Sequence, residues 1–514
     1  MTQAGYITDV EYTGNFYPYQ APAWLAYIAA INGYTAPPLD GRFSWCELGC
    51  GKGITSLLLA ATHPLGEFHA CDFNPAHIEY AERLRSAAAV GNVAFHFKSF
   101  AQMLEAQLPA FDFIVLHGVY SWVPEPVRAQ IREFARSRLK RGGLLMVSYN
   151  AMPGWAHVQP LRRMMQAYIE GLPGDSIDKA RAAFAYVSAL ARNGAAYFKT
   201  APAAERHLEQ IARQDIHYVA HEYLTPHGDP FYFSEVEGAM REAGLSYAGS
   251  MVPADNYAEL MVPAPFRDLL PKVPSRVALE LHRDFVANTS FRPDLYIAQA
   301  PARQPVDLPL DRLDGLAFCL VNLPERLPLR SEGGPLQFNL EDQETAVRAV
   351  HALLASGPAS AREIHQVAGK RTTSETSFVI QQLVVSRHLA ACPPVRAAKG
   401  WLQVNSALIE AGIREQLQQV PLACPGTGSG SYSEIVHAAA IEAAVRFDDA
   451  GAAATAVLGR LRQLGHPISR TSSSGEKQPA TDAEVLDYIS TTWRNLHDAT
   501  NPNARLLQML GLLA

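Results

Sequence analysis

Short apolar runs alternate with amphipathic stretches between residues 43 and 149. The apolar runs, at 43–48, 68–72, 93–97, 111–116 and 143–149, predict strands. Apolar side chains at helical spacing predict helices at 52–61, 76–89 and 123–139. Strands that alternate with helices in this way form a mostly parallel sheet with helices on both faces. The pattern therefore predicts an α/β, doubly wound core over residues 43–150.

The same pattern resumes only after residue 230. Ser234 and Glu237 have the spacing of a capping box, and Gly244 has the position of a helix end before a further strand. Residues 231–300 are therefore expected to complete the sheet. Residues 151–230, with helical stretches at 178–191 and 203–213, form a helical insertion. We expect it to cover the active site as a lid; the alternative is an accessory unit far from the chemistry.

The rest of the chain begins with proline-containing boundaries at 301–305 and 324–335. Helices expected at 341–356, 360–367 and 374–389, with an apolar wing ending at 401–404, give residues 301–410 a resemblance to a winged helix. Residues 411–514 are expected to be helical, with helices at 434–446 and 452–464 and flexible loops at 426–431 and 471–478. Neither region carries a catalytic cluster, so contact with an acceptor protein or formation of a homodimer is the expected role.

Candidate chemistry begins at the turn after the first strand, where Glu47, Gly49, Gly51 and Gly53 stand at alternate positions. Glycine lets the backbone turn tightly and approach a ligand, and the helix start that follows offers unpaired N–H groups. The third glycine comes one residue too early for the dinucleotide motif G-x-G-x-x-G. The pattern resembles the first motif of class I S-adenosylmethionine-dependent methyltransferases. An ordinary strand–helix turn is the plainer interpretation of the glycines alone.

Asp72 strengthens the cofactor interpretation. It closes the second strand about 20 residues after the glycines, where an acidic side chain accepts hydrogen bonds from ribose hydroxyls. Asn74 and Pro75 then have the N-cap and first positions of a helix. We therefore expect S-adenosyl-L-methionine as the cofactor, with Cys50 and Phe73 as further contacts.

Ligands of such sheets bind beyond the carboxyl ends of the strands. The side chains that follow the third, fourth and fifth strands are Ser99, Phe100, His117, Tyr120, Trp122 and Asn150. We assign the first two to the adenine region and the last four to catalysis. His117 is also a candidate cofactor contact, and a purely structural histidine is the equal alternative. The (D/N)-P-P-(F/Y) motif of many amine-methylating enzymes is not found after the fourth strand, which leaves the acceptor open.

Aromatic residues gather before the first strand, in residues 1–42; they are Tyr12, Phe16, Tyr17, Tyr19 and Trp24. Because a sulfonium cation is attracted to aromatic faces, this segment is expected to cap the cofactor. Hydrophobic docking of a leading helix is the alternative. The candidate acceptor-binding residues are Tyr17, Tyr19, Trp155 and Tyr223.

His217 and His221 stand four residues apart, as metal ligands on a helix do. Glu222 follows the second histidine instead of lying between the two, so the metalloprotease pattern fails. Methyl transfer needs no metal. We therefore predict a packed turn near the substrate entrance and no metal site.

Composition limits the remaining possibilities. A net charge of −6 disfavours a nucleic-acid partner. Six cysteines in 514 residues provide no disulfide framework. No apolar run approaches the roughly 20 residues of a membrane helix, and the first residues lack a signal-peptide pattern. We therefore expect a cytoplasmic protein without membrane insertion.

Four motifs together are similar to those of one family: ELGCG at 47–51, CDFNP at 71–75, HGVYSWV at 117–123 and YNAMPGW at 149–155. They resemble class I methyltransferases that carry a methyltransferase regulatory domain, a group that includes rickettsial enzymes methylating lysines of outer-membrane proteins. HEYL at 221–224 and PFYF at 230–233 are similar to the start of that domain. The resemblance implies a seven-stranded Rossmann-like sheet and protein lysine N-methylation.

A lysine amine, with a reference pKa of about 10.4, must lose its proton before it can attack. An apolar channel lowers that pKa. Its candidate lining residues are Tyr120, Trp122, Asn150 and Trp155, and His117 is a candidate proton acceptor. Two alternatives stay open. A small-molecule N- or O-methyltransferase predicts a closed pocket under residues 151–230, and a non-catalytic scaffold predicts cofactor binding without methyl transfer.

Overall fold

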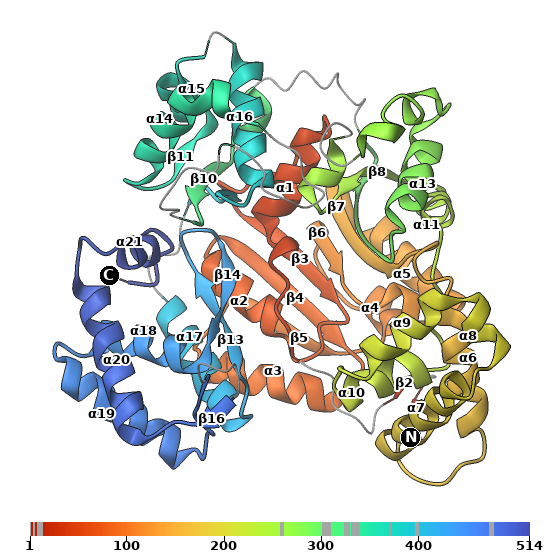
Figure 1. The fold of residues 1–514 in the computed structure, drawn as a ribbon. Helices are drawn as coiled ribbons and strands as arrows, with labels where there is room; N and C mark the ends of the chain where they lie inside the picture. Colours follow the sequence, from red (N-terminus) through yellow and green to blue (C-terminus); the bar gives the residue numbers. More distant parts are fainter. Residues whose placement is uncertain are drawn as a thin grey trace.

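A mixed sheet of seven strands forms the centre of the computed structural model (Figure 1). The structure describes residues 2–3, 6–7, 14–257, 262–300, 310–322, 329, 339–370, 372–395, 400–471 and 477–513. The strands lie in the order β5-β4-β3-β6-β7-β9-β8. Their bounds are β3 Phe43–Leu48, β4 Gly66–Asp72, β5 Val93–Phe97, β6 Phe111–Leu116, β7 Leu139–Asn150, β8 Leu245–Ser250 and β9 Phe291–Ala298.

Strands β3 to β7 pair in parallel, and β9 pairs antiparallel with both β7 and β8. The predicted α/β fold with seven strands is thus confirmed. Strands β3, β5 and β6 have the predicted bounds. β7 begins at Leu139 instead of residue 143, because Leu139 pairs with Phe111 across an irregular register.

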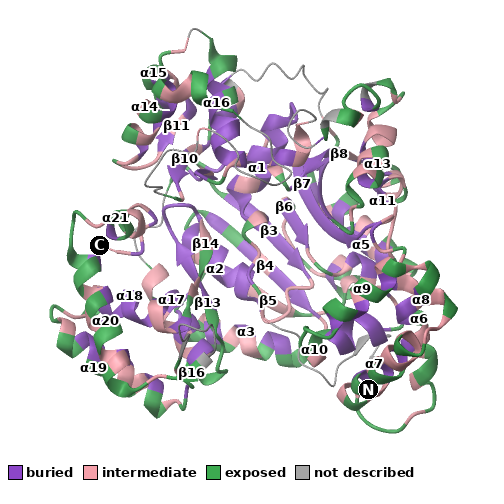
Figure 2. Cartoon of the chain, in the orientation of Figure 1, coloured by how far each residue is buried: buried purple, intermediate pink, exposed green. Residues whose placement is uncertain are grey.

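Helices cover both faces of the sheet, as predicted (Figure 1). Successive side chains of a strand point to opposite faces. Trp45 and Phe113 pack with helices α1, α2 and α3, whereas Cys46 and Ile114 pack with α4, α5 and α11. The central strands are accordingly buried along most of their length (Figure 2). The helix bounds are α1 Pro22–Ile31, α2 Ile54–Thr62, α3 Pro75–Ala87, α4 Phe100–Glu105, α5 Glu125–Arg138 and α11 Phe233–Glu242.

Two predicted helix starts have different outcomes. Asn74 caps α3, because its side chain accepts the Ala76 N–H, and Pro75 is the first helical residue. The capping box expected at Ser234 is wrong. Glu235 accepts the Tyr232 N–H at 2.7 Å, so α11 begins at Phe233, ahead of the predicted cap.

The insertion after β7 is a small helical unit with a core of its own. Leu161, Val187 and Leu208 are among the side chains buried there. The helices predicted at 178–191 and 203–213 correspond to α7 and α9. The unit consists of α6 Val158–Ile169, α7 Ser176–Arg192, α8 Ala196–Thr200, α9 Pro202–Ile211, α10 Ile216–Val219 and a π-helical turn Ala220–Leu224.

Beyond β9, three helices accompany a small antiparallel sheet of order β11-β10-β12. The wing predicted to end at 401–404 is wrong, since these residues form the first turn of α17 Trp401–Arg414. The boundaries expected at 301–305, 324–328 and 330–335 lie outside the described residues. The elements are β10 Ala317–Leu320, α14 Glu344–Leu354, β11 Ala359–Ser360, α15 Ala361–Ala368, α16 Thr373–Val385 and β12 Leu389–Cys392.

The last part of the chain contains the two predicted helices as α18 Ile435–Arg446 and α19 Ala450–Gln463. The flexible loop expected at 426–431 is wrong, because these residues turn between two paired strands, β13 Gln419–Cys424 and β14 Ser429–Glu434. The loop expected at 471–478 is bounded by strands β15 Ser469–Thr471 and β16 Lys477–Pro479; residues 472–476 lie outside the described part. Helices α20 Asp482–His497 and α21 Pro502–Met509 follow.

The β13–β14 hairpin lies against the cofactor half of the sheet. Gly430 on β14 is so close to α2 that a Cβ added there would lie 2.8 Å from Leu58 Cδ1. The Tyr432 hydroxyl accepts the Phe16 N–H at 2.7 Å. Lys52, at the start of α2, pairs with Glu415 at 3.1 Å. The carboxyl-terminal region therefore supports both α2 and the segment that precedes α1.

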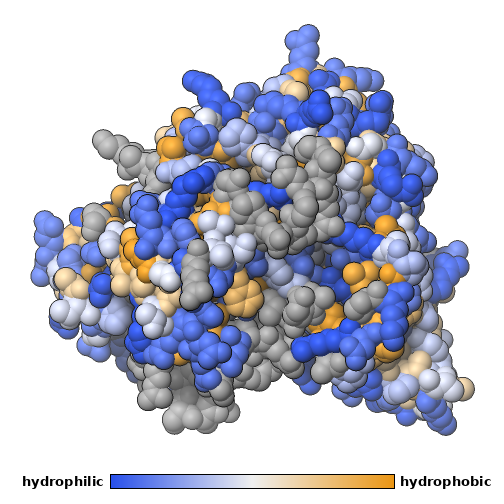
Figure 3. Space-filling model, turned by 90° about the horizontal axis from the view of Figure 1, so that it is seen from above, coloured by the Kyte–Doolittle hydropathy of each residue, from blue (hydrophilic) through white to orange (hydrophobic). Residues whose placement is uncertain are grey.

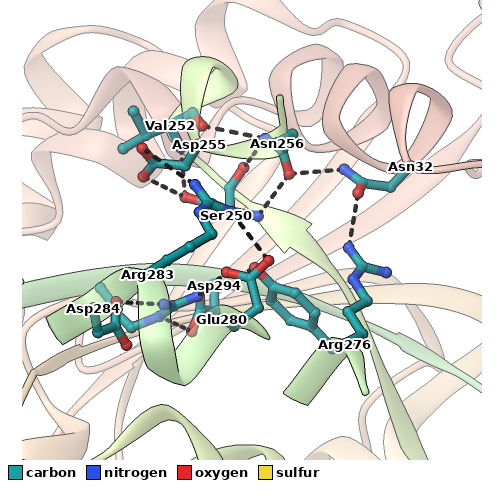
Figure 4. Close-up of polar contacts among 12 residues, drawn as sticks. Asn32, Ser250, Val252, Asp255, Asn256, Arg276, Glu280, Arg283, Asp284 and Asp294 are labelled. Atoms are coloured by element: carbon teal, nitrogen blue, oxygen red, sulfur yellow. Dashed lines mark hydrogen bonds and ion pairs between the residues drawn. The ribbon is translucent and has the colours of Figure 1, made fainter. Parts of the chain in front are cut away.

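A buried charge cluster joins β9 to helix α13 Arg276–Ala287 (Figure 4). Arg292 donates to Asp284 at 2.7 Å, to Asp294 at 3.0 Å and to Glu280 at 3.2 Å. The Tyr149 hydroxyl on β7 also donates to Asp294, at 2.6 Å. The cluster therefore fixes the antiparallel end of the sheet from three elements.

The outer surface differs from this interior. The face seen from above is hydrophilic over most of its area, with smaller hydrophobic groups between (Figure 3). None of the described helices combines the length and apolar content that crossing a membrane requires.

Candidate active site

The glycine turn between β3 and α2 bends toward the end of β4. Gly49, Gly51 and Gly53 all have positive φ angles, of 78°, 53° and 70°. The N–H groups of Gly49 and Cys50 donate to the Cys71 carbonyl, both at 2.9 Å. A Cβ added to Gly51 would have no atom within 4 Å. Gly51 thus presents open space on the side of the turn where a ligand can approach.

Gly53 has a different role from the predicted cofactor contact. It does not line the cofactor cavity described below, and it is the N-cap of α2. A Cβ at this position would lie 2.5 Å from Phe95 Cε1 and 2.7 Å from Ala81 Cβ. The third glycine is therefore needed for close packing between the turn, α3 and β5.

Replacement of Gly53 by alanine is expected to lower the free energy of unfolding by about 2–4 kcal/mol, from the left-handed backbone and the overpacked Cβ together. Urea unfolding of the cofactor-free protein measures the loss. Gly51→Ala is the matched control, because it imposes the left-handed penalty without a clash. Equal losses in the two variants would show that packing around Gly53 has no such role.

A cavity of about 310 Å³ opens on the glycine turn. Most of the predicted cofactor residues line it: Glu47, Gly49, Cys50, Gly51, Asp72, Phe73, Ser99, Phe100 and His117. The Ser56 hydroxyl donates to Glu47. Burial nevertheless raises the pKa of the Glu47 carboxyl to about 8. We call this space the first cavity.

Asp72 connects the two strand ends that border the first cavity. One carboxylate oxygen accepts the Gly51 N–H at 2.9 Å, and the other accepts the Asn74 N–H at 2.8 Å. His77 Nδ1 lies 3.3 Å from the second oxygen. Each carboxylate oxygen can accept more than one hydrogen bond, so Asp72 can also receive ribose hydroxyls. The geometry fits the ribose-binding role predicted from the sequence.

A second cavity, of about 600 Å³, adjoins the first, and His117, Gly118 and Trp122 line both. Its other walls come from β7, the insertion and the start of β9. Among its lining residues are Asn150, Trp155, His207, Tyr218, Glu222, Tyr223 and Phe291. The insertion therefore contributes directly to this cavity.

His117 lies at the boundary between the cavities. Its Nδ1 lies 2.7 Å from the Tyr19 hydroxyl and 3.0 Å from the Ser148 hydroxyl. The Tyr17 ring lies against it, with 3.7 Å between the ring centroids. Burial lowers the pKa of His117 to about 3. The imidazole is therefore neutral at ordinary pH and is poorly suited to hold a proton from an amine.

The other aromatic candidates divide between cavity and core. Trp122 and Trp155 line the second cavity with their rings 6.1 Å apart. Tyr120 lines neither cavity; it is buried, and its hydroxyl accepts a hydrogen bond from Arg132 at 2.9 Å. The predicted catalytic placement of Tyr120 is therefore wrong, because the turn Tyr120–Trp122 directs its first side chain inward.

The amino-terminal aromatic residues also fall into two groups, those near the cavities and those in the core. Tyr17 lines the first cavity, whereas Tyr19 lines neither cavity and reaches the site through His117. Phe16 packs in the core, and Trp24 donates to the Met251 carbonyl at 3.0 Å. Tyr12 lies outside the described residues. Hydrophobic docking thus describes Phe16 and Trp24, whereas capping of the cofactor by Tyr17 stays a prediction.

Several cavity residues were missed by sequence reasoning, notably Tyr218, Glu222 and His207. Glu222 lies in the run predicted as a packed turn near the substrate entrance, but no role of its own is predicted for this side chain. The sequence feature that could have identified Glu222 is an acidic residue between a histidine and a tyrosine in an otherwise apolar turn. Placement beside the cofactor cavity depends on how the whole insertion folds back, which local spacing does not encode.

Comparison with known proteins agrees with this geometry. Residues 40–187 match the family described as a methyltransferase domain, and residues 215–298 match the one described as a predicted methyltransferase regulatory domain. An uncharacterized Synechocystis protein, sll1526, is 34% identical over 365 residues, which cover 70% of this chain and 71% of the relative. The chain belongs to the methyltransferases that carry a methyltransferase regulatory domain.

Two rickettsial proteins extend the comparison. The solved structure of PKMT2 from Rickettsia typhi in complex with AdoHcy has the same fold, with a TM-score of 0.69 and 21% identity over 94% of this chain and 98% of that one. An uncharacterized protein of Rickettsia prowazekii, RP789, is 28% identical over 56% of this chain and 51% of its own length. The protein is an S-adenosylmethionine-dependent methyltransferase, as predicted.

Both matched regions of this methyltransferase contribute to the second cavity. Trp122 and Asn150 come from the methyltransferase domain, and Glu222, Tyr223 and Phe291 come from the regulatory domain. The regulatory domain also supplies strands β8 and β9 of the central sheet. It is therefore a structural part of the candidate active site.

Proposed function

We propose that this methyltransferase methylates lysine side chains of an acceptor protein. The observation that carries the proposal is the second cavity, which meets the first at His117 and Trp122 and combines aromatic walls with a buried carboxyl. An aliphatic side chain ending in an amine fits such walls, because aromatic faces attract a cation and apolar surroundings favour the neutral amine. The likeness of fold to Rickettsia typhi PKMT2 supports the same class of acceptor.

The residues of the first cavity would hold the cofactor. Asp72 would accept the ribose hydroxyls, Phe73 and Phe100 would border the adenine, and the turn at Gly51 would lie beside the amino-acid part. When bound, S-adenosylmethionine supplies an electrophilic methyl group. Trp122 and Asn150 would position the amine for in-line attack, so orientation and exclusion of water provide most of the rate enhancement.

Incubation with isotope-labelled S-adenosylmethionine and whole-cell protein tests the acceptor class. We expect mass spectrometry to find the label on lysine side chains, and we expect none with Trp122→Ala, which removes a ring from both cavities. Tyr186→Ala, on the exposed face of α7, is the control for loss of an aromatic ring. Label confined to small molecules would support the small-molecule alternative, and cofactor binding without any transfer would support a scaffold.

The carboxyl-terminal region is our candidate for acceptor recognition or for formation of a homodimer. It contacts the core through the β13–β14 hairpin and α17 while α19 and α20 lie away from the sheet (Figure 1). Light scattering on the full chain measures the oligomeric state directly.

A further inference from the structure

We propose that Glu222 binds the ammonium group of the acceptor and takes up its proton before methyl transfer. This inference rests on the proposed function and assigns a residue of the regulatory domain to the chemistry. It concerns the π-helical turn Ala220–Leu224, a rare element that is frequent at functional sites.

Glu222 belongs to the second cavity, which shares His117, Gly118 and Trp122 with the first. Its side chain is buried and lines the second cavity. Burial and, in addition, the charge of Glu222 raise the pKa of the Tyr17 hydroxyl, which lines the first cavity. The same two causes raise the pKa of the Tyr218 hydroxyl, which lines the second. A group bound at Glu222 would therefore lie beside the space where the methyl donor binds.

The nearest cation does not neutralise the Glu222 carboxyl by contact. The Arg162 guanidinium donates instead to backbone carbonyls, those of Glu222 at 2.8 Å, Thr225 at 2.8 Å and Gly228 at 2.7 Å. Arg162 thus stabilises the turn through hydrogen bonds to its backbone. Among the described side chains, none donates a hydrogen bond to the carboxyl. The Asn150 amide nitrogen in the same cavity is also buried without a hydrogen-bond partner there.

Two such polar groups in one cavity point to a ligand that pairs with them. A buried carboxyl without a partner lowers the stability of the fold, so such groups are normally paired. The walls around Glu222 carry the rings of Trp122, Tyr218 and Tyr223. Aromatic faces and one carboxylate suit an organic ammonium ion. The described residues contain no cluster of three side chains that could hold a metal ion.

The electrostatics suit proton transfer. Burial raises the pKa of Glu222 to about 8, with Arg162 opposing the shift. An apolar cavity lowers the pKa of a lysine ammonium toward the same range. The charged and titratable groups that surround Glu222 or line its cavity are Tyr17, His117, His157, Arg162, Arg206, His207, Tyr218 and Tyr223. Of these, His117 is buried with its pKa lowered to about 3.

The Glu222 carboxylate takes one proton from the ammonium and becomes a carboxylic acid, leaving a neutral amine. The nitrogen lone pair then forms the new bond to the methyl carbon as the carbon–sulfur bond breaks, and that bonding pair stays on sulfur. The product is a methylammonium group and S-adenosylhomocysteine, and Glu222 returns its proton to solvent.

Calorimetry of the full chain with saturating S-adenosylhomocysteine tests the proposal without turnover. The probe is n-butylammonium, which carries the aliphatic chain and amine of lysine. At pH 7 free Glu222 is mostly protonated, and pairing with the ammonium requires it to ionise. Binding is therefore expected to release about one proton per amine, measured as the dependence of the heat on buffer ionisation. The release should fall toward zero above pH 9, where Glu222 is already ionised.

Glu222→Gln is expected to eliminate this proton release and to lower kcat by at least about 100-fold, with unchanged affinity for S-adenosylhomocysteine. Glu222→Asp should restore part of both. Glu209→Gln, an exposed change on α9, is the matched control and should alter neither. Amine binding by the unaltered chain without proton release would overturn the proposal, whatever happens to the variants.

Calorimetry and the labelling experiment together separate failure of this proposal from failure of the proposed function. Proton release without label on protein lysines would retain Glu222 as the amine site and reassign the acceptor to small amines. Label on protein lysines without proton release, or with full activity of Glu222→Gln, would retain lysine methylation and reject the role of Glu222.

Discussion

Arg292→Met is expected to destabilise the protein by about 3–5 kcal/mol, because it leaves the carboxylates of Glu280, Asp284 and Asp294 buried without their shared cation. Burial already raises the pKa of Asp284 to about 6 with Arg292 in place. Methionine retains much of the side-chain volume, so the loss reports mainly on charge.

Urea unfolding measures this effect. Arg241→Met is the control, because the Arg241 side chain on α11 is 70% exposed although its partner Glu237 is buried, and its loss should cost less than about 1 kcal/mol. The shape of the second cavity should change as well, since Phe291, which lines it, directly precedes Arg292. Equal losses for the two arginine variants would mean that the cluster is not what stabilises this end of the sheet.

Asp72→Ala is expected to abolish measurable binding of S-adenosylhomocysteine. Hydrogen bonds to a charged group contribute about 1.5–3 kcal/mol each, so losing two of them weakens binding by at least about 100-fold. The change also removes the acceptor of the Gly51 and Asn74 N–H groups. Asp72→Asn retains the shape of the side chain and should still bind much more weakly than the unaltered protein.

Isothermal titration calorimetry measures both variants, with circular dichroism as the check on folding. Glu67→Gln is the matched control, because Glu67 lies at the other, exposed end of the same strand. Undiminished affinity in Asp72→Ala would remove Asp72 from the cofactor site.

The parts of the fold that sequence reasoning predicted correctly are those set by local pattern. Strands β3, β5 and β6 are bounded by turns and made of apolar residues, so their bounds follow from the chain itself. The strand-end rule likewise selected Asp72 and His117, because the carboxyl ends of parallel strands converge at one edge.

The incorrect predictions concern residues whose structure is determined by contacts with residues distant in sequence. Tyr120 and Trp122 belong to one short turn, yet only the second faces the cavities, since Arg132 and Phe231 surround the first. The small residues at 426–431 predict flexibility, but their size lets β14 approach α2 closely. Glu222 joins the site through the folding of the insertion, in which Arg162 on α6 donates to the Glu222 carbonyl.

The hydrogen bond between Phe16 and Tyr432 spans 416 positions of sequence. During translation, Phe16 and Tyr17 are synthesised long before Tyr432, whose hydroxyl accepts the Phe16 N–H. A chain still attached to the ribosome can form strands β3 to β9 while the aromatic cover of the cofactor site lacks its distant support. Full closure of that site therefore comes late in synthesis, and a chain cut short before β14 should bind cofactor through the glycine turn and Asp72 with the amino-terminal segment unsupported.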